Sequence, residues 1–83
     1  MQKKKTAGRL TKVERATLEA LASGEVMTVD RSNMSWIGTR PVQFSTRNAL
    51  TSRRLITRLD QSKPADAPGN GFVISDKGKA ALA

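Results

Sequence analysis

Several residue types are missing from this chain or scarce in it. Of its 83 residues none is cysteine, none is histidine and three are aromatic. Without cysteine the chain forms no disulfide and offers no thiolate to a metal. Without histidine it also lacks the commonest metal ligand and the commonest general base. These absences argue against an enzyme, and the sequence indicates no metal, no other cofactor and no small-molecule substrate.

Long apolar runs are missing too. No stretch approaches the roughly 18 residues that a membrane-spanning helix needs. The basic start MQKKKTAGRL has no apolar stretch behind it, so it does not resemble a signal peptide. We therefore expect no membrane partner and a cytoplasmic location. The length predicts one small domain, which buries only about 60% of the surface of its unfolded chain.

The net charge of +8 is unevenly distributed along the chain. Residues 1–9 contain no acid, and neither do residues 31–59, which hold six arginines. Because residues 1–9 offer nothing to bury, we expect a disordered basic arm there and a folded domain over residues 10–83. Charge of one sign gathered in two segments is unlike a solvated surface of mixed signs. It predicts a polyanionic partner, most often nucleic acid.

The first half of the domain predicts a helix followed by a β-hairpin. In LTKVERATLEALASG, Thr11 and Glu14 have the spacing of a capping box, and Gly24 stands where a helix ends. The residues expected on the inner face of this helix are Leu10, Val13, Thr17, Leu18 and Leu21. Residues 25–44 alternate like strands around the turn cluster DRSN. Trp36 could stack on a base, but a lone tryptophan in so small a protein is more often an anchor of the core or of the hairpin.

The second half predicts a helix, two paired strands and a last short helix. Ser45 is expected to cap a helix from residue 46 to 53 or 54. LITRLD and GFVIS read as strands joined by the loop QSKPADAPGN, and Ser75 as the cap of a helix over DKGKAALA. The residues predicted to share one core are Leu18, Leu21, Leu50, Ile56, Phe72, Ile74 and Leu82.

STRNALTSRRLI and GFVISDKGKAAL, together with the opening helix, resemble the winged helix-turn-helix DNA-binding domains of small bacterial and phage transcriptional regulators. The resemblance covers residues 10–83. It implies an α+β, winged-helix-like single domain: helix, β-hairpin, recognition helix, two-stranded wing and short C-terminal helix. The chain departs from the family twice. Arg54 stands where the family usually has a glycine with positive φ, and a hairpin is expected where the family has another helix.

The resemblance implies sequence-specific binding of double-stranded DNA, with the helix near 45–54 in the major groove. The wing over 59–72 and the basic arm would lie on the backbone. If Ala49 and Leu50 face the core, the outward side chains include the expected base-reading residues, Arg47, Asn48 and Thr51. The expected phosphate contacts are Lys3, Lys4, Lys5, Arg9, Ser45, Ser52, Arg54, Arg58 and Lys63.

Two other partners remain open. The protein could be a protein-interaction or inhibitor module on a winged fold, because a fold does not determine a function. It could also be a basic RNA-binding or ribosome-associated protein, although few aromatic residues are available for base stacking. A cationic recognition helix favours DNA over a protein partner. A monomer and a homodimer are both compatible with the sequence.

Overall fold

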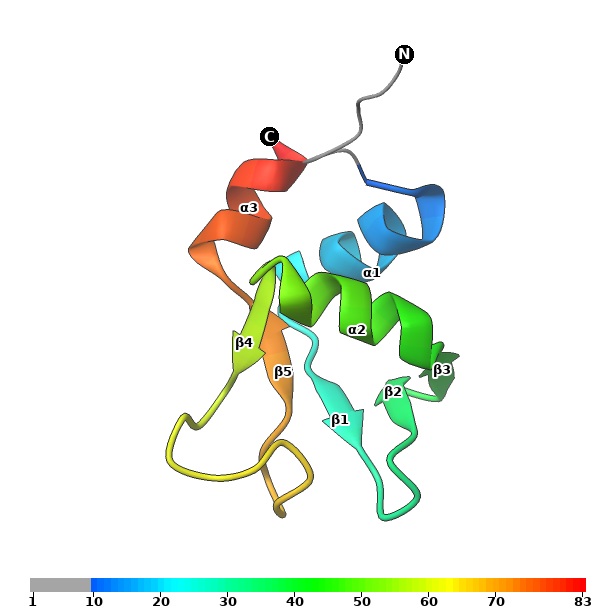
Figure 1. Ribbon diagram of the computed structural model, residues 1–83, viewed down its shortest axis with the longest axis vertical. Helices are drawn as coiled ribbons and strands as arrows, with labels where there is room; N and C mark the ends of the chain where they lie inside the picture. Colours follow the sequence, from blue (N-terminus) through cyan, green and yellow to red (C-terminus); the bar gives the residue numbers. More distant parts are fainter. Residues whose placement is uncertain (1–9) are drawn as a thin grey trace.

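The computed structural model describes residues 10–83, so the expected basic arm at 1–9 lies outside the described residues. The domain is α+β, with three helices and one five-stranded antiparallel sheet (Figure 1). None of the described helices is long and apolar enough to cross a membrane. The elements follow in the order α1 (Lys12–Ala22), β1 (Met27–Val29), β2 (Ser35–Ile37), β3 (Arg40–Val42), α2 (Phe44–Ser52), β4 (Ile56–Arg58), β5 (Phe72–Ile74) and α3 (Asp76–Leu82).

Helix α1 begins with the predicted capping box. The Thr11 hydroxyl accepts the Glu14 N–H at 3.1 Å, and the Glu14 carboxylate accepts the Thr11 N–H at 3.0 Å. These bonds satisfy backbone donors that have no partner inside the helix. Of the expected inner face, Thr17, Leu18 and Leu21 are buried. The expectation for Val13 is wrong: its side chain is 56% exposed and borders a shallow groove between α1 and β3.

The predicted hairpin is present, and it continues into a third strand. The turn between β1 and β2 is held by Asp30, whose carboxylate accepts the N–H groups of Ser32 and Met34 at 2.8 and 3.0 Å. Strand β3 was not predicted. It pairs with β2 through a two-residue turn in which Gly38 takes a φ of 63°. The sheet order is β3-β2-β1-β5-β4, so the hairpin joins the β4–β5 pair through β1.

Helix α2 starts earlier than predicted. Its N-cap is Gln43, which makes no side-chain bond, so the expectation that Ser45 caps the helix is wrong and Ser45 lies in the first turn. The helix ends in a Schellman motif: the N–H of Leu55 donates to the Leu50 carbonyl at 2.9 Å, and the N–H of Arg54 donates to the Thr51 carbonyl at 3.0 Å. Arg54 occupies the glycine position with a φ of 60°.

One face of the sheet carries the core. The residue pairs Met27–Phe72, Met27–Ile37 and Ile56–Ile74 stand opposite each other in the register, so their side chains share that face. The predicted core is confirmed: four of its members are buried, and Phe72, Ile74 and Leu82 pack against them half-buried. The buried hydrophobic residues that were not predicted are Met27, Ile37, Val42 and Leu55.

The loop between β4 and β5 is organised by one buried side chain. Asn70 is 5% exposed, although most of the loop residues before it are exposed. Its amide nitrogen donates to the carbonyls of Asp60, Lys63 and Pro64, and its amide oxygen accepts the N–H of Asp60 at 2.8 Å. The loop is therefore folded around Asn70, although it contains no helix or strand.

Candidate nucleic-acid interface

The outer face of α2 is polar and carries no charge. Ser45, Asn48 and Ser52 are exposed on it, and all three were predicted to contact DNA. The Ser52 hydroxyl donates to the Asn48 carbonyl at 2.6 Å, which leaves its oxygen lone pairs free to accept. The Asn48 side-chain amide has no hydrogen-bond partner among the described residues, so it is free to bind a ligand. Phe44, in the first turn, is 55% exposed.

Arg47 does not project outward, and this expectation is wrong. The side chain is 8% exposed. Its guanidinium donates to the Ser35 hydroxyl at 2.8 Å and to the backbone and side-chain oxygens of Asn33 at 3.3 and 3.1 Å. It also lies over the Phe44 ring, 4.7 Å from the centroid. The reason is the rotation of the helix: its buried residues are Thr46, Arg47 and Leu50, whereas Ala49 is only half-buried.

Thr51 is half-buried at the side of α2. Its hydroxyl donates to the carbonyls of Arg47 and Asn48, both at 3.0 Å. The hydroxyl proton is thus used within the helix, and only the oxygen lone pairs remain for a ligand. Of the three expected base-reading residues, Asn48 alone is exposed.

The expected phosphate contacts beyond the helix are exposed where the structure describes them. Arg54 and Arg58 are both exposed, and Arg58 donates to the Gln61 carbonyl at 3.2 Å. Lys63 lies 3.9 Å from the Asp60 carboxylate, with both side chains largely exposed, so this ion pair is weak. Lys3, Lys4, Lys5 and Arg9 lie outside the described residues.

Two arginines of residues 31–59, the segment without acids, pair with acids outside that segment. One acid lies in α1 and the other follows it. Arg53 lies 3.3 Å from the Glu14 carboxylate, and Arg40 lies 3.8 Å from that of Glu25. Because Arg47 is buried as well, the expectation of a cationic outer face on α2 is wrong. The exposed charge lies after the helix, at Arg54 and along the β4–β5 loop.

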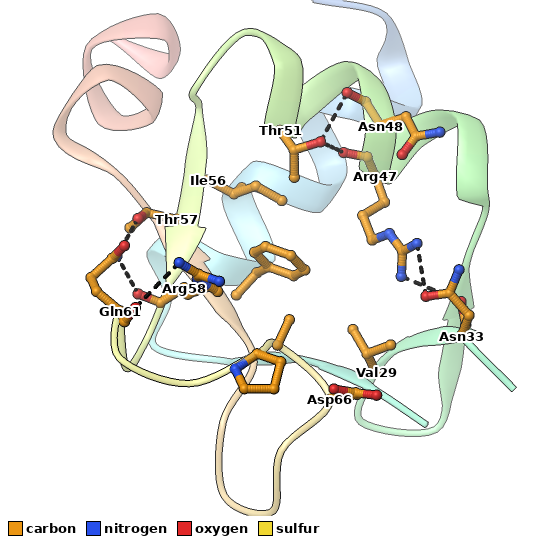
Figure 2. Close-up of a pocket in the computed structure, with 13 residues that line it drawn as sticks. Val29, Asn33, Arg47, Asn48, Thr51, Ile56, Thr57, Arg58, Gln61 and Asp66 are labelled. Carbon is orange, nitrogen blue, oxygen red and sulfur yellow. Dashed lines mark hydrogen bonds between the residues drawn. The ribbon is translucent and has the colours of Figure 1, made fainter. Parts of the chain in front are cut away.

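A groove of about 620 Å³ lies beside α2 (Figure 2). Arg47, Asn48 and Thr51 border it from the helix, Arg58 from the end of β4, Gln61 from the β4–β5 loop, and Asn33 from the β1–β2 turn. Its other lining residues are Val29, Ile56, Thr57, Pro64, Ala65, Asp66 and Phe72. The sequence did not indicate this groove, because its walls come from three segments far apart along the chain.

Two carboxyl groups in the turns that flank the groove have lowered pKa values. The pKa of Asp30 is lowered chiefly by the Trp36 indole N–H, which donates to it at 3.0 Å, and then by the Met34 N–H. The pKa of Asp60 is lowered chiefly by the Ser62 hydroxyl and then by the Ser62 N–H. Both carboxylates therefore support turns. Within residues 10–83 no three acidic side chains come together in a group that could hold a metal ion.

No family model matches the chain, and no curated protein and no solved structure matches it significantly. Its function is therefore argued from its own residues.

Proposed function

We propose that this protein binds double-stranded DNA with sequence preference, as a small transcriptional regulator. The outer face of α2 would enter the major groove, and the β4–β5 loop and the basic arm would follow the backbone. The observation that carries the proposal is a set of polar and cationic side chains on α2 and the segment after it, namely Asn48, Ser52, Arg54 and Arg58. All four side chains are exposed, and no acid occurs between residues 31 and 59.

The groups on this surface suit the two kinds of contact that a DNA reader makes. The free side-chain amide of Asn48 can bind adenine through two hydrogen bonds in the major groove. The Ser45 hydroxyl and the exposed arginines suit phosphate oxygens, which position a protein without reading sequence. Both Asn48 and Arg47 were expected to read bases. Because Arg47 is buried, Asn48 is the one that takes this role in the proposal.

The topology also supports the proposal. Helix α2 leads directly into β4, the long loop and β5, and β5 pairs with β1, which follows the first helix. This order of recognition helix, strand, wing and strand is what the resemblance to winged domains implies. In this chain β2 and β3 stand where those domains have a further helix.

One observation favours a second candidate, a protein partner. The outer face of α2 is neutral, and the exposed Phe44 ring lies at its start. An aromatic side chain exposed beside polar groups is typical of a protein interface. The net charge of +8 favours the nucleic acid, because the summed positive charge of the whole molecule attracts a polyanion.

The test is a mobility shift of the full-length chain on a random-sequence duplex at rising salt, followed by selection of the bound sequences. We expect binding that weakens steeply with salt, because each phosphate contact releases counterions, and enrichment of one short motif. Single-stranded RNA of the same length and polyglutamate serve as controls. Equal binding to polyglutamate would show that DNA binding depends on net charge alone. Tighter binding to RNA would favour the RNA alternative. No binding to any polyanion would favour a protein partner.

A further inference from the structure

The groove beside α2 contains a buried charge with no opposite charge at hydrogen-bonding distance. Arg47 is 8% exposed, and none of the ion pairs within residues 10–83 includes it. Its three hydrogen bonds all go to the neutral oxygens of Asn33 and Ser35. A guanidinium has five N–H donors. Two of those on Arg47 therefore have no acceptor among the described residues.

Such a charge favours a bound anion. A buried cation is costly unless a counter-charge or a full set of hydrogen bonds compensates it. The neutral acceptors of Arg47 and the Phe44 ring, 4.7 Å away, compensate its charge only in part. Figure 2 shows the Arg47 side chain running along one wall of the groove toward Asn33, with Arg58 on the opposite wall. The one acid of the lining, Asp66, is exposed and forms no ion pair with either arginine.

The base of the groove is apolar. Val29, Ile56 and Phe72 line it, and they come from the three adjacent strands β1, β4 and β5. Ile56 is a member of the core and Phe72 packs against it, so the groove opens beside the core face of the sheet. An open apolar surface with a few converging polar groups is the usual form of a small-molecule site, and a volume of about 620 Å³ lies in the range of such sites.

We propose that this groove binds a small organic anion, namely a planar ring that carries one phosphate or carboxylate group. The anionic group lies between Arg47 and Arg58, and the ring rests on Val29, Ile56 and Phe72. The amides of Asn48 and Gln61 border the same groove and select polar substituents. Because Asn48 also belongs to the proposed DNA surface, the ligand acts as an effector that competes with DNA. The binding itself does not depend on the proposed function.

The test is a titration of the isotope-labelled full-length protein followed by NMR. Four probes separate the contribution of the ring from that of the anionic group. Adenosine 5′-monophosphate and benzoate carry both. Inorganic phosphate carries the anionic group alone, and adenosine carries the ring alone. We expect one of the first two to bind at least about tenfold more tightly than phosphate and adenosine. The comparison between them identifies the anionic group. The shifts should lie at the Arg47 side-chain N–H and at the amides of Asn48, Arg58 and Phe72.

Variants decide whether the arginines hold the anion. Arg47→Met and Arg58→Gln should each weaken binding of the preferred probe severalfold, whereas Arg40→Gln, an exposed arginine outside the groove, should leave it unchanged. If Arg47→Met does not fold, Arg58→Gln and the wild-type shifts decide the matter. The proposal is overturned if no probe binds in the millimolar range, if the shifts lie outside the groove, or if neither groove variant weakens binding. It is also overturned if only duplex DNA shifts the groove residues, because the groove then holds the DNA backbone.

Discussion

The guanidinium of Arg53, at the end of α2, lies 3.3 Å from the carboxylate of Glu14, in the first turn of α1. The same carboxylate accepts the Thr11 N–H and completes the capping box of α1. Both side chains of the pair are largely buried, with exposures of 30% and 13%. One acid therefore caps the first helix and fixes the last turn of the second helix against it.

Replacing Glu14 separates these two roles. Glu14→Ala should lower the free energy of unfolding by about 1–2 kcal/mol, because both the cap and the ion pair are lost. Glu14→Gln keeps the cap geometry and should cost less. Glu19→Ala, an exposed acid of the same helix, should stay within about 0.5 kcal/mol of wild type. Denaturant unfolding measures all three, and equal losses for Glu14→Ala and Glu19→Ala would contradict the assignment.

Arg54 tests the left-handed end of α2. Its φ of 60° is costly for a side chain with a Cβ atom and free for glycine. Arg54→Gly should therefore raise the midpoint of denaturant unfolding, by about 0.5–1 kcal/mol in stability. Arg54→Ala removes the same charge and keeps the strain, so it should give no such gain. If alanine stabilises as much as glycine, the charge and not the backbone is responsible.

Asn70 tests whether the β4–β5 loop has a fixed structure. Asn70→Ala leaves three carbonyls and one N–H without their partner, and it should cost about 2–3 kcal/mol. Hydrogen exchange in residues 59–71 should rise in the same variant. Asn48→Ala, which removes an exposed asparagine, is the matched control and should change stability by less than about 0.5 kcal/mol. A loop that exchanges equally fast in both variants would contradict the role of Asn70.

The bond between Trp36 and Asp30 predicts a pH dependence. The folded pKa of Asp30 lies below its unfolded value, so its contribution is present above the unfolded pKa, about 3.9, and is lost as the pH falls through the folded pKa. Trp36→Phe removes the indole donor and should raise the pKa of Asp30 toward its ordinary value, as measured by NMR of the carboxyl carbon. An unchanged pKa of Asp30 would show that the turn N–H groups alone are responsible.

The sequence predicts most of the elements because their signals are local. The capping box at Thr11, the turn at Asp30 and the cap at Ser75 each depend on atoms within a few residues, and all three are present. Strand β3 was missed because three residues including Pro41 carry almost no periodicity. The start of α2 was misplaced because Ser45 has the chemistry of a cap, while Gln43 makes no capping bond at all.

The site was less predictable than the fold. Leu50 is the one large aliphatic side chain of α2, so the pattern did not determine how the helix is rotated. The helix is rotated slightly from the expected orientation, so Arg47 points into the protein, where Asn33 and Ser35 accept its hydrogen bonds. The partners of Arg47 and Arg53 lie 12 or more residues away in sequence. No local pattern shows such contacts, so the sequence did not reveal that Arg53 pairs with Glu14 or that neutral oxygens hold Arg47.

Binding of Asn48→Ala and Arg58→Ala to the selected duplex and to a scrambled one, each at several salt concentrations, tests the proposed DNA contact most directly. Asn48→Ala should weaken the selected site by about 1–3 kcal/mol and the scrambled site much less, because it removes a base contact. Arg58→Ala should weaken both duplexes alike and lower the salt slope by about one unit, and Lys77→Ala, an exposed lysine on α3, should change neither. If both variants fold and bind both duplexes like the wild type, the surface from Asn48 to Arg58 does not contact DNA.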